Sequence, residues 1–251
     1  MNYKEYGKEN RDVMILLHGG GLSWWNYEEA AEILQTKFRI ILPILDGHAG
    51  SDSEFTSIEE NASRIVEYID KEHNGKVFLI GGLSLGGQIA TEILAQRKDI
   101  CKYAIIESAL VLPMRFTYYM IKPAFTMSYG LIKKKWFSKL QFKSLRIKPS
   151  LFDRYYEDTC KIQKGDMISF LKANSSYVVK PEIEHTEAKV KILVGSKEAA
   201  KMKKSARKLH RVIPGSSMEI LEGFYHGELS INNSYRYVSV INELLDENEN
   251  I

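Results

Sequence analysis

Short apolar runs alternate with amphipathic segments along most of this chain. Six runs rich in β-branched residues end at glycine, proline or a polar residue, as buried parallel strands do. They are Val13–Leu17, Ile40–Leu42, Val77–Ile80, Tyr103–Ile106, Val190–Val194 and Met218–Leu221. Five segments with apolar residues three and four positions apart, typical of half-buried helices, are Tyr27–Thr36, Ile58–Glu72, Gln88–Arg97, Lys201–Val212 and Asn233–Leu245. The alternation predicts an α/β fold, a doubly wound and mostly parallel sheet of about six to seven strands.

Composition and length fit one globular domain. The chain has 251 residues, of which 44% are hydrophobic and 27% charged, values near those of ordinary soluble proteins. Its two cysteines, Cys101 and Cys160, are far apart, which favours a reducing compartment over a disulfide framework. Charged residues interrupt the apolar stretch Ile105–Ile132, and the first residues show no apolar signal segment. We therefore expect a soluble cytoplasmic protein.

One segment breaks the alternation of strands and helices. Residues 111–180 contain 14 Lys and Arg but only 4 Asp and Glu, are rich in aromatic residues and include no clear strand. We predict that residues 1–110 and 181–251 form the α/β core and that residues 111–180 form a helical cap over the carboxyl end of the sheet. The alternative is an ordinary run of connecting helices.

The strongest chemical signal is the sequence from Gly82 to Gly86, a G-x-S-x-G pattern that follows an apolar strand and opens a helix. In that context the turn exposes the serine hydroxyl, and the glycines allow neighbouring backbone to pass closely. The pattern predicts that Ser84 is a nucleophile. A glycine-rich structural turn is the alternative.

A second glycine-rich loop, His18–Gly21, follows the first apolar run. Acyl transfer produces an oxyanion that preorganised backbone N–H groups stabilise. We expect the amides of Gly20 and Leu85 to supply these donors, with Gly21 as the alternative to Gly20. His18 is interpreted as a structural residue that braces the loop.

Serine needs a general base, and six histidines are present. His226 follows the last predicted strand, so a doubly wound sheet would return it beside Ser84. The third member should be a carboxylate that orients the imidazole. Glu198, just beyond the run Val190–Val194, is the preferred acid, and Glu107, just after Tyr103–Ile106, is the rival.

With these pieces in order, the sequence resembles the α/β-hydrolase superfamily, in its capped branch of monoacylglycerol lipases and esterases. The matching motifs are HGGG at His18–Gly21, DGHAGSD at Asp46–Asp52, GLSLGG at Gly82–Gly87, VGSKE at Val194–Glu198 and GFYHGE at Gly223–Glu228. The resemblance implies a Ser84, Glu198 and His226 triad and no cofactor or metal. Glutamate at the acid position departs from the commoner aspartate, which keeps Glu107 open. Serine at position 84 argues against the dehalogenase and epoxide hydrolase members, which use aspartate there.

The expected activity is hydrolysis of a carboxylic ester with an apolar portion, which Gly21, Trp24 and Trp25 would help to bind. A C–C bond hydrolase, a thioesterase, an acyltransferase, or a ligand sensor without turnover would share the same motifs. Lys133, Lys134 and Lys135 precede Trp136 and could touch anionic lipid, but aromatics that pack the cap onto the core are favoured over membrane contact. We expect no nucleic-acid partner, and the sequence leaves the oligomeric state open.

Overall fold

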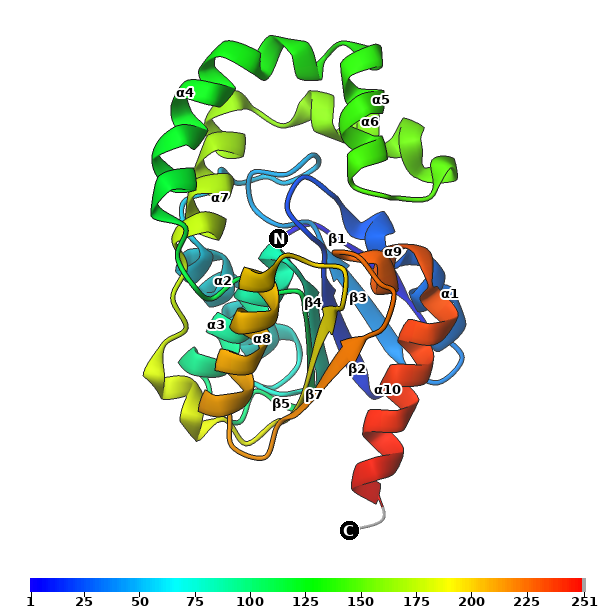
Figure 1. Cartoon of the computed structure of the whole chain (residues 1–251). Coiled ribbons are helices and arrows are strands. Elements are labelled where there is room, and N and C mark those ends of the chain that lie inside the picture. Colours follow the sequence, from blue (N-terminus) through cyan, green and yellow to red (C-terminus); the bar gives the residue numbers. More distant parts are fainter. Residues whose placement is uncertain (250–251) are drawn as a thin grey trace.

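The protein, described here from a computed structural model covering residues 1–249, is built on one seven-stranded sheet (Figure 1). The strand order is β1-β3-β2-β4-β5-β6-β7; β1 is antiparallel to β3 and all other neighbours are parallel. The strands are β1 (Tyr3–Tyr6), β2 (Val13–Leu17), β3 (Arg39–Pro43), β4 (Val77–Leu83), β5 (Cys101–Glu107), β6 (Lys189–Gly195) and β7 (Ser217–Leu221). The predicted α/β fold with a mostly parallel sheet is therefore confirmed.

The two faces of the sheet bury two separate apolar clusters. In β2, Ile15 faces one cluster with α2, α3 and α8, while its neighbours Met14 and Leu16 face the other with α1 and α10. This division follows from the alternation of side chains along a strand. The helices around the sheet are η1 (Trp24–Tyr27), α1 (Glu28–Leu34), α2 (Ile58–Glu72), α3 (Leu85–Gln96), η3 (Pro181–His185), α8 (Ala200–Val212), α9 (Glu228–Asn232) and α10 (Ser234–Glu249).

A helical segment between β5 and β6 lies beyond the carboxyl ends of the strands (Figure 1). Its elements are α4 (Arg115–Ile132), α5 (Lys135–Ser144), η2 (Pro149–Leu151), α6 (Phe152–Lys161) and α7 (Lys164–Ser176). We call α4 to α7 the cap helices. Of these, α7 packs on α2 and α3, whereas α4 packs on α7 and α5.

Specific polar contacts fasten the cap helices to the core. The indole N–H of Trp25 donates to Asp158 in α6 over 2.8 Å, and the backbone N–H of Phe55 donates to Asp166 in α7 over 2.8 Å. On α3, the amide of Gln88 donates to the backbone oxygen of Asn174. These contacts hold α6 against the segment after β2, and α7 against the loop after β3 and against α3.

Most predicted elements lie where the sequence pattern put them, with three differences: strand β1 (Tyr3–Tyr6) precedes the six predicted runs, and two helices differ in detail. The start of the predicted helix Tyr27–Thr36 is the 3₁₀ turn η1, and the short helix α9 precedes α10. Neither Cys101 nor Cys160 forms a disulfide in the described chain. Among residues 1–249, no helix combines the length and apolar character needed to cross a bilayer.

Candidate active site

Ser84 occupies the tight turn between β4 and α3. Its φ of 54° and ψ of −110° are strained values for a residue with a side chain, and such strain is common at functional positions. The glycines on either side are required by close backbone approaches. A Cβ on Gly86 would lie 2.1 Å from the Leu17 carbonyl oxygen, and one on Gly82 would lie 2.2 Å from the oxygen of Gly86. The G-x-S-x-G pattern is thus explained by sterics.

A hydrogen-bonded chain of three side chains starts at this serine. The Nε2 atom of His226 lies 3.0 Å from Ser84 Oγ, and its Nδ1 atom lies 2.7 Å from Glu198 Oε2. A carboxylate can only accept, so Nδ1 carries the proton and Nε2 is free to accept from the serine hydroxyl. The structure therefore brings together the three residues that the sequence predicted as nucleophile, base and acid.

Glu198 is held as a charged carboxylate. Its side chain is 1% exposed, and burial alone would raise its pKa. Hydrogen bonds from His226, from the Ser108 hydroxyl at 2.7 Å and from the Gly195 N–H at 2.7 Å outweigh burial, so the pKa of Glu198 lies below its ordinary value. Both carboxylate oxygens are therefore engaged, one by the histidine and the other by two fixed donors.

The rival carboxylate, Glu107, does not contact His226. Its Oε1 accepts a long hydrogen bond of 3.4 Å from the Ser230 N–H, and its buried Oε2 has no partner among the described residues. Burial, and secondarily the charge of Glu198, raise the pKa of Glu107 to about 7. The structure thus separates the two candidates, with Glu198 at the imidazole and Glu107 behind it in the core.

The raised pKa of Glu107 gives a stability prediction. In the unfolded chain this carboxyl ionises near its ordinary value of 4.5, whereas in the folded protein it keeps its proton up to about pH 7. The folded state then binds more protons between these values, so this group's contribution to stability is full below pH 4.5 and is lost as the pH rises through 7. We expect the free energy of unfolding of Glu107→Gln, relative to wild type, to increase by about 3 kcal/mol across that interval.

Urea denaturation at several pH values between 4 and 8 measures this difference. Replacing the exposed Glu54 by glutamine is the matched control, and its difference from wild type should stay flat. A Glu107→Gln difference that does not change with pH would refute the assignment.

Two buried histidines fix the glycine-rich loop after β2. The Gly21 N–H donates to His48 Nε2 over 3.0 Å, and His18 Nε2 accepts from the Leu45 N–H over 3.1 Å. Burial lowers the pKa of His48 to about 4 and the pKa of His18 well below 6.5, so both rings are neutral near pH 7. His18 is the structural brace that the sequence predicted. The Gly21 amide is occupied in this arrangement, whereas the Gly20 amide makes no hydrogen bond within residues 1–249.

The two tryptophans after this loop differ in their surroundings. Trp25 is 3% exposed and packs in the core, with its indole N–H on Asp158. Trp24 is half-buried, and the cationic groups of Lys4 and Arg154 lie over its ring. Trp25 therefore joins core to cap, and a role in substrate binding stays a prediction for Gly21, Trp24 and Trp25.

A cavity of about 310 Å³ opens beside His226. Its walls come from the loop after α5, from the segment after β6 that carries Glu198, and from the loop after β7 that carries His226. At this point the guanidinium of Arg146 stacks 3.7 Å from the centre of the Tyr225 ring. Several lining residues are apolar along much of their length: Leu145, Ala199, Met202 and Tyr225. His226 and Glu198 line this space, whereas Ser84 does not.

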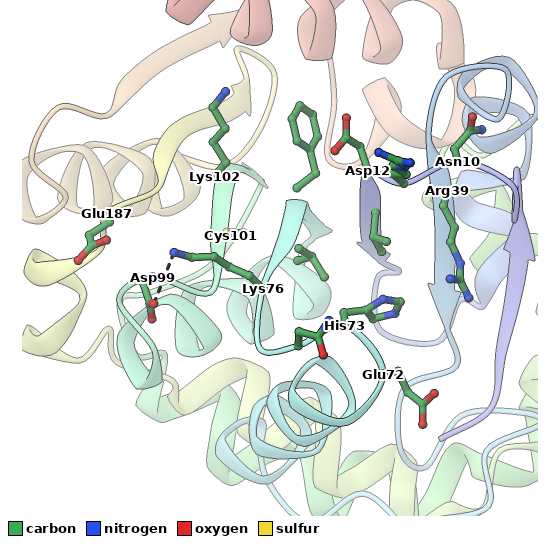
Figure 2. Close-up of a pocket in the computed structure, with 15 residues that line it drawn as sticks. Asn10, Asp12, Arg39, Glu72, His73, Lys76, Asp99, Cys101, Lys102 and Glu187 are labelled. Carbon is green, nitrogen blue, oxygen red and sulfur yellow. Dashed lines mark ion pairs between the residues drawn. The ribbon is translucent and has the colours of Figure 1, made fainter.

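A larger cavity of about 730 Å³ lies at the opposite end of the sheet (Figure 2). It is lined by the first residues of β2 to β5, among them Val13, Val77 and Cys101. Its charged residues have mixed signs, and Lys76 pairs with Asp99 at 3.5 Å. In open α/β sheets ligands bind at the carboxyl ends of strands, where Ser84 lies, so this cavity is not part of the candidate site.

Two residues that support the candidate site were not identified from the sequence. Ser108, with φ 53°, donates to Glu198, and His48 stacks on Phe170 of α7 with ring centroids 4.7 Å apart. Both Ser108 and His48 follow predicted strands, which was the available signal. Within residues 1–249, no group of three His, Cys, Asp or Glu side chains is placed to hold a metal ion.

Fold and site together define a class of protein: an α/β enzyme scaffold with a serine, a histidine and a carboxylate joined at the carboxyl end of a parallel sheet. The family model described as alpha/beta hydrolase fold matches residues 12–214, so the chain belongs to the alpha/beta hydrolase family. No curated protein matches the sequence significantly.

Solved structures show the same fold at low identity. A thermophilic esterase from Thermogutta terrifontis superposes with a TM-score of 0.79 at 16% identity, covering 98% of this chain and 93% of the esterase. The enol-lactonase from Burkholderia xenovorans LB400 gives 0.81 at 14% identity, covering 98% and 96%. MenH from S. aureus gives 0.78 at 18% identity, covering 98% of both chains. At these identities the similarity establishes the fold alone.

Proposed function

We propose that this protein is a serine hydrolase that cleaves a carboxylic ester through an acyl-enzyme. The observation that carries the proposal is the hydrogen-bonded chain from Ser84 through His226 to Glu198. Ser84 Oγ attacks the ester carbonyl while His226 Nε2 accepts its proton. His226 then returns that proton to the leaving alcohol, and water resolves the acyl-enzyme by the same route. Glu198 holds the imidazole tautomer and stabilises its cation.

The oxyanion formed in each step needs donors already in place. Gly20 and Leu85 are the proposed donors, because neither backbone N–H makes a hydrogen bond within the described residues. Leu85 is also the first residue of α3, where the helix dipole favours negative charge. In the resting arrangement Gly21 donates to His48, which favours Gly20 over Gly21 as the first donor.

The cavity beside His226 supports a substrate with an apolar portion. Leu145 comes from the segment after α5, and Ala199 and Met202 come from the region after β6. The core and the cap helices would therefore enclose the apolar portion of the substrate together. We propose that residues 111–180 act as a cap that excludes water from the acyl-enzyme. The two free cysteines agree with work in the cytoplasm, where thiols stay reduced.

The proposed activity is tested with p-nitrophenyl esters of graded acyl length and with a fluorophosphonate probe. We expect the wild-type protein to be labelled and to turn over esters, with a kcat/KM that depends on the length of the acyl chain. Labelling without ester turnover would point instead to a thioester, a C–C bond substrate, acyl transfer or sensing. A protein that is neither labelled nor active would overturn the proposal.

A further inference from the structure

Large apolar side chains face solvent along one side of α4. Phe116, Met120, Met127 and Leu131 are spaced four, seven and four residues apart, a spacing that puts them in one stripe of a helix. Phe116 is 80% exposed and Met127 87%. On α5, Trp136 and Leu140 are exposed one turn apart, at 64% and 62%. We call these six side chains, together with the seven exposed Lys and Arg of residues 115–144, the outer cap face.

This stripe is not needed to pack α4 on the rest of the protein. A different set of side chains does that: Ile121 and Ile132 are buried, and Phe125 and Tyr129 pack against the main apolar cluster. The helix is therefore apolar on two sides, of which only one packs against other residues within the described part of the chain. Clustered exposed apolar residues of this kind mark a surface that meets something else.

The expectation that the aromatics pack the cap onto the core holds for only part of them. Phe142, Tyr155 and Phe170 are buried, as expected, whereas Phe116, Tyr119 and Trp136 point away from the core. Their places differ: α4 lies outside α7 (Figure 1), and on α5 Phe142 packs into the second apolar cluster while Trp136 is exposed.

The charge of the outer cap face has one sign. Residues 115–144, which span α4 and α5, contain seven Lys and Arg and no Asp or Glu. All four acidic residues of the segment 111–180 lie on the other two cap helices, α6 and α7. In the described chain, only Lys135 among the seven cations forms an ion pair, with Asp153. The face thus offers both apolar side chains and cations without counter-charges.

We propose that the outer cap face docks on a lipid surface that carries anionic headgroups. Interfacial helices of this type insert apolar side chains at the headgroup boundary and place lysines against anionic lipid. A second copy of the same face would bring two all-cationic surfaces together, which opposes a symmetric dimer. Nucleic acid would use the lysines but leave Met127 and Leu131 in water. The docking is peripheral, since no helix of residues 1–249 could cross a bilayer.

Docking this way would set the catalytic machinery near its substrate. Helix α5, which carries part of the outer cap face, leads directly into the loop with Leu145 and Arg146. These two residues line the cavity beside His226. The binding itself does not depend on the proposed ester chemistry. It can therefore be tested with lipids that the enzyme has no ester bond to cleave.

The experiment is flotation of the full chain with vesicles of ether-linked phospholipids. We expect binding to vesicles with about 30% phosphatidylglycerol, little binding to pure phosphatidylcholine, and release at high salt. Changing Lys133, Lys134 and Lys139 to glutamine should weaken binding about 100-fold. Changing Phe116, Met127 and Trp136 to serine should weaken it at least about tenfold.

Matched controls keep the result specific. One control changes Lys8, Lys37 and Lys189 to glutamine; these lysines are exposed and lie outside the cap helices, so the same charge is removed elsewhere. The other control changes Tyr235, 83% exposed, to serine and removes an exposed aromatic side chain elsewhere. Both should bind as wild type does, and unchanged melting temperatures confirm that the variants fold. Equal binding to neutral vesicles, equal loss in the controls, or a dimer in sedimentation that the serine variant abolishes would overturn the proposal.

Discussion

Replacing Ser84 by alanine should lower ester kcat/KM by about 10⁶-fold and abolish fluorophosphonate labelling. Alanine keeps the Cβ and can adopt the same strained turn, so the loss would come from the missing hydroxyl and not from a changed backbone. Any remaining rate would come from substrate binding and from the proposed donors Gly20 and Leu85, which would still stabilise an oxyanion formed by attack of water. Initial rates with the best p-nitrophenyl ester and gel-based labelling measure both effects.

A helical serine far from the site provides the control for this experiment. Ser63 on α2 is half-buried and donates to the Glu59 carbonyl, and its change to alanine should leave kcat/KM within about twofold. Labelling that survives Ser84→Ala would show that another residue reacts with the probe and would remove Ser84 as nucleophile.

Changing Glu198 to glutamine should lower kcat by about 10³–10⁴-fold, the effect of losing the carboxylate that fixes a catalytic histidine. Glutamine offers either an oxygen or an NH₂ group to His226 Nδ1, but no negative charge for the imidazolium. If its oxygen accepts from Nδ1, its NH₂ group instead faces the Ser108 hydroxyl and the Gly195 N–H, which need an acceptor there. The loss should appear mainly in kcat, because Glu198 acts through the histidine.

Glu107→Gln is the matched comparison, since both carboxyls are buried behind the same site. It should keep kcat within about tenfold, because Glu107 makes no hydrogen bond to His226. A collapse of activity in Glu107→Gln with a mild effect in Glu198→Gln would reverse the assignment of the acid.

The sequence predicted the sheet well because its strands are buried on both sides. Runs such as Val13–Leu17 and Val190–Val194 face apolar clusters above and below, so nearly every position must be apolar. The position of Ser84 was equally predictable, because Gly82 and Gly86 are required where backbone atoms would touch a Cβ. Sterics of this kind leave a signal within a few residues of the site.

Other features depend on contacts between distant segments and left no such signal. Both glutamates come after predicted apolar runs, but in the structure Glu107 is the last residue of β5, opposite Leu193 of β6. Glu198 lies beyond the end of β6, where it meets His226. The role of Ser108 depends on the same pairing of β5 with β6. The exposure of Phe116 and Trp136 could not be predicted either, because the sequence pattern of an aromatic residue on a helix is the same whether the residue is buried or exposed.

The stacking of His48 on Phe170 connects helix α7 with the glycine-rich loop after β2. Phe170 belongs to α7, and His48 holds the Gly21 N–H in the loop that also carries Gly20. If α7 shifts when a substrate enters or leaves, the packing of His48 on Phe170 changes. The loop that His48 holds would then move, and the direction of the Gly20 N–H would change with it. With Gly20 as the proposed oxyanion donor, access to the site and stabilisation of the oxyanion would be coupled through the neutral imidazole of His48.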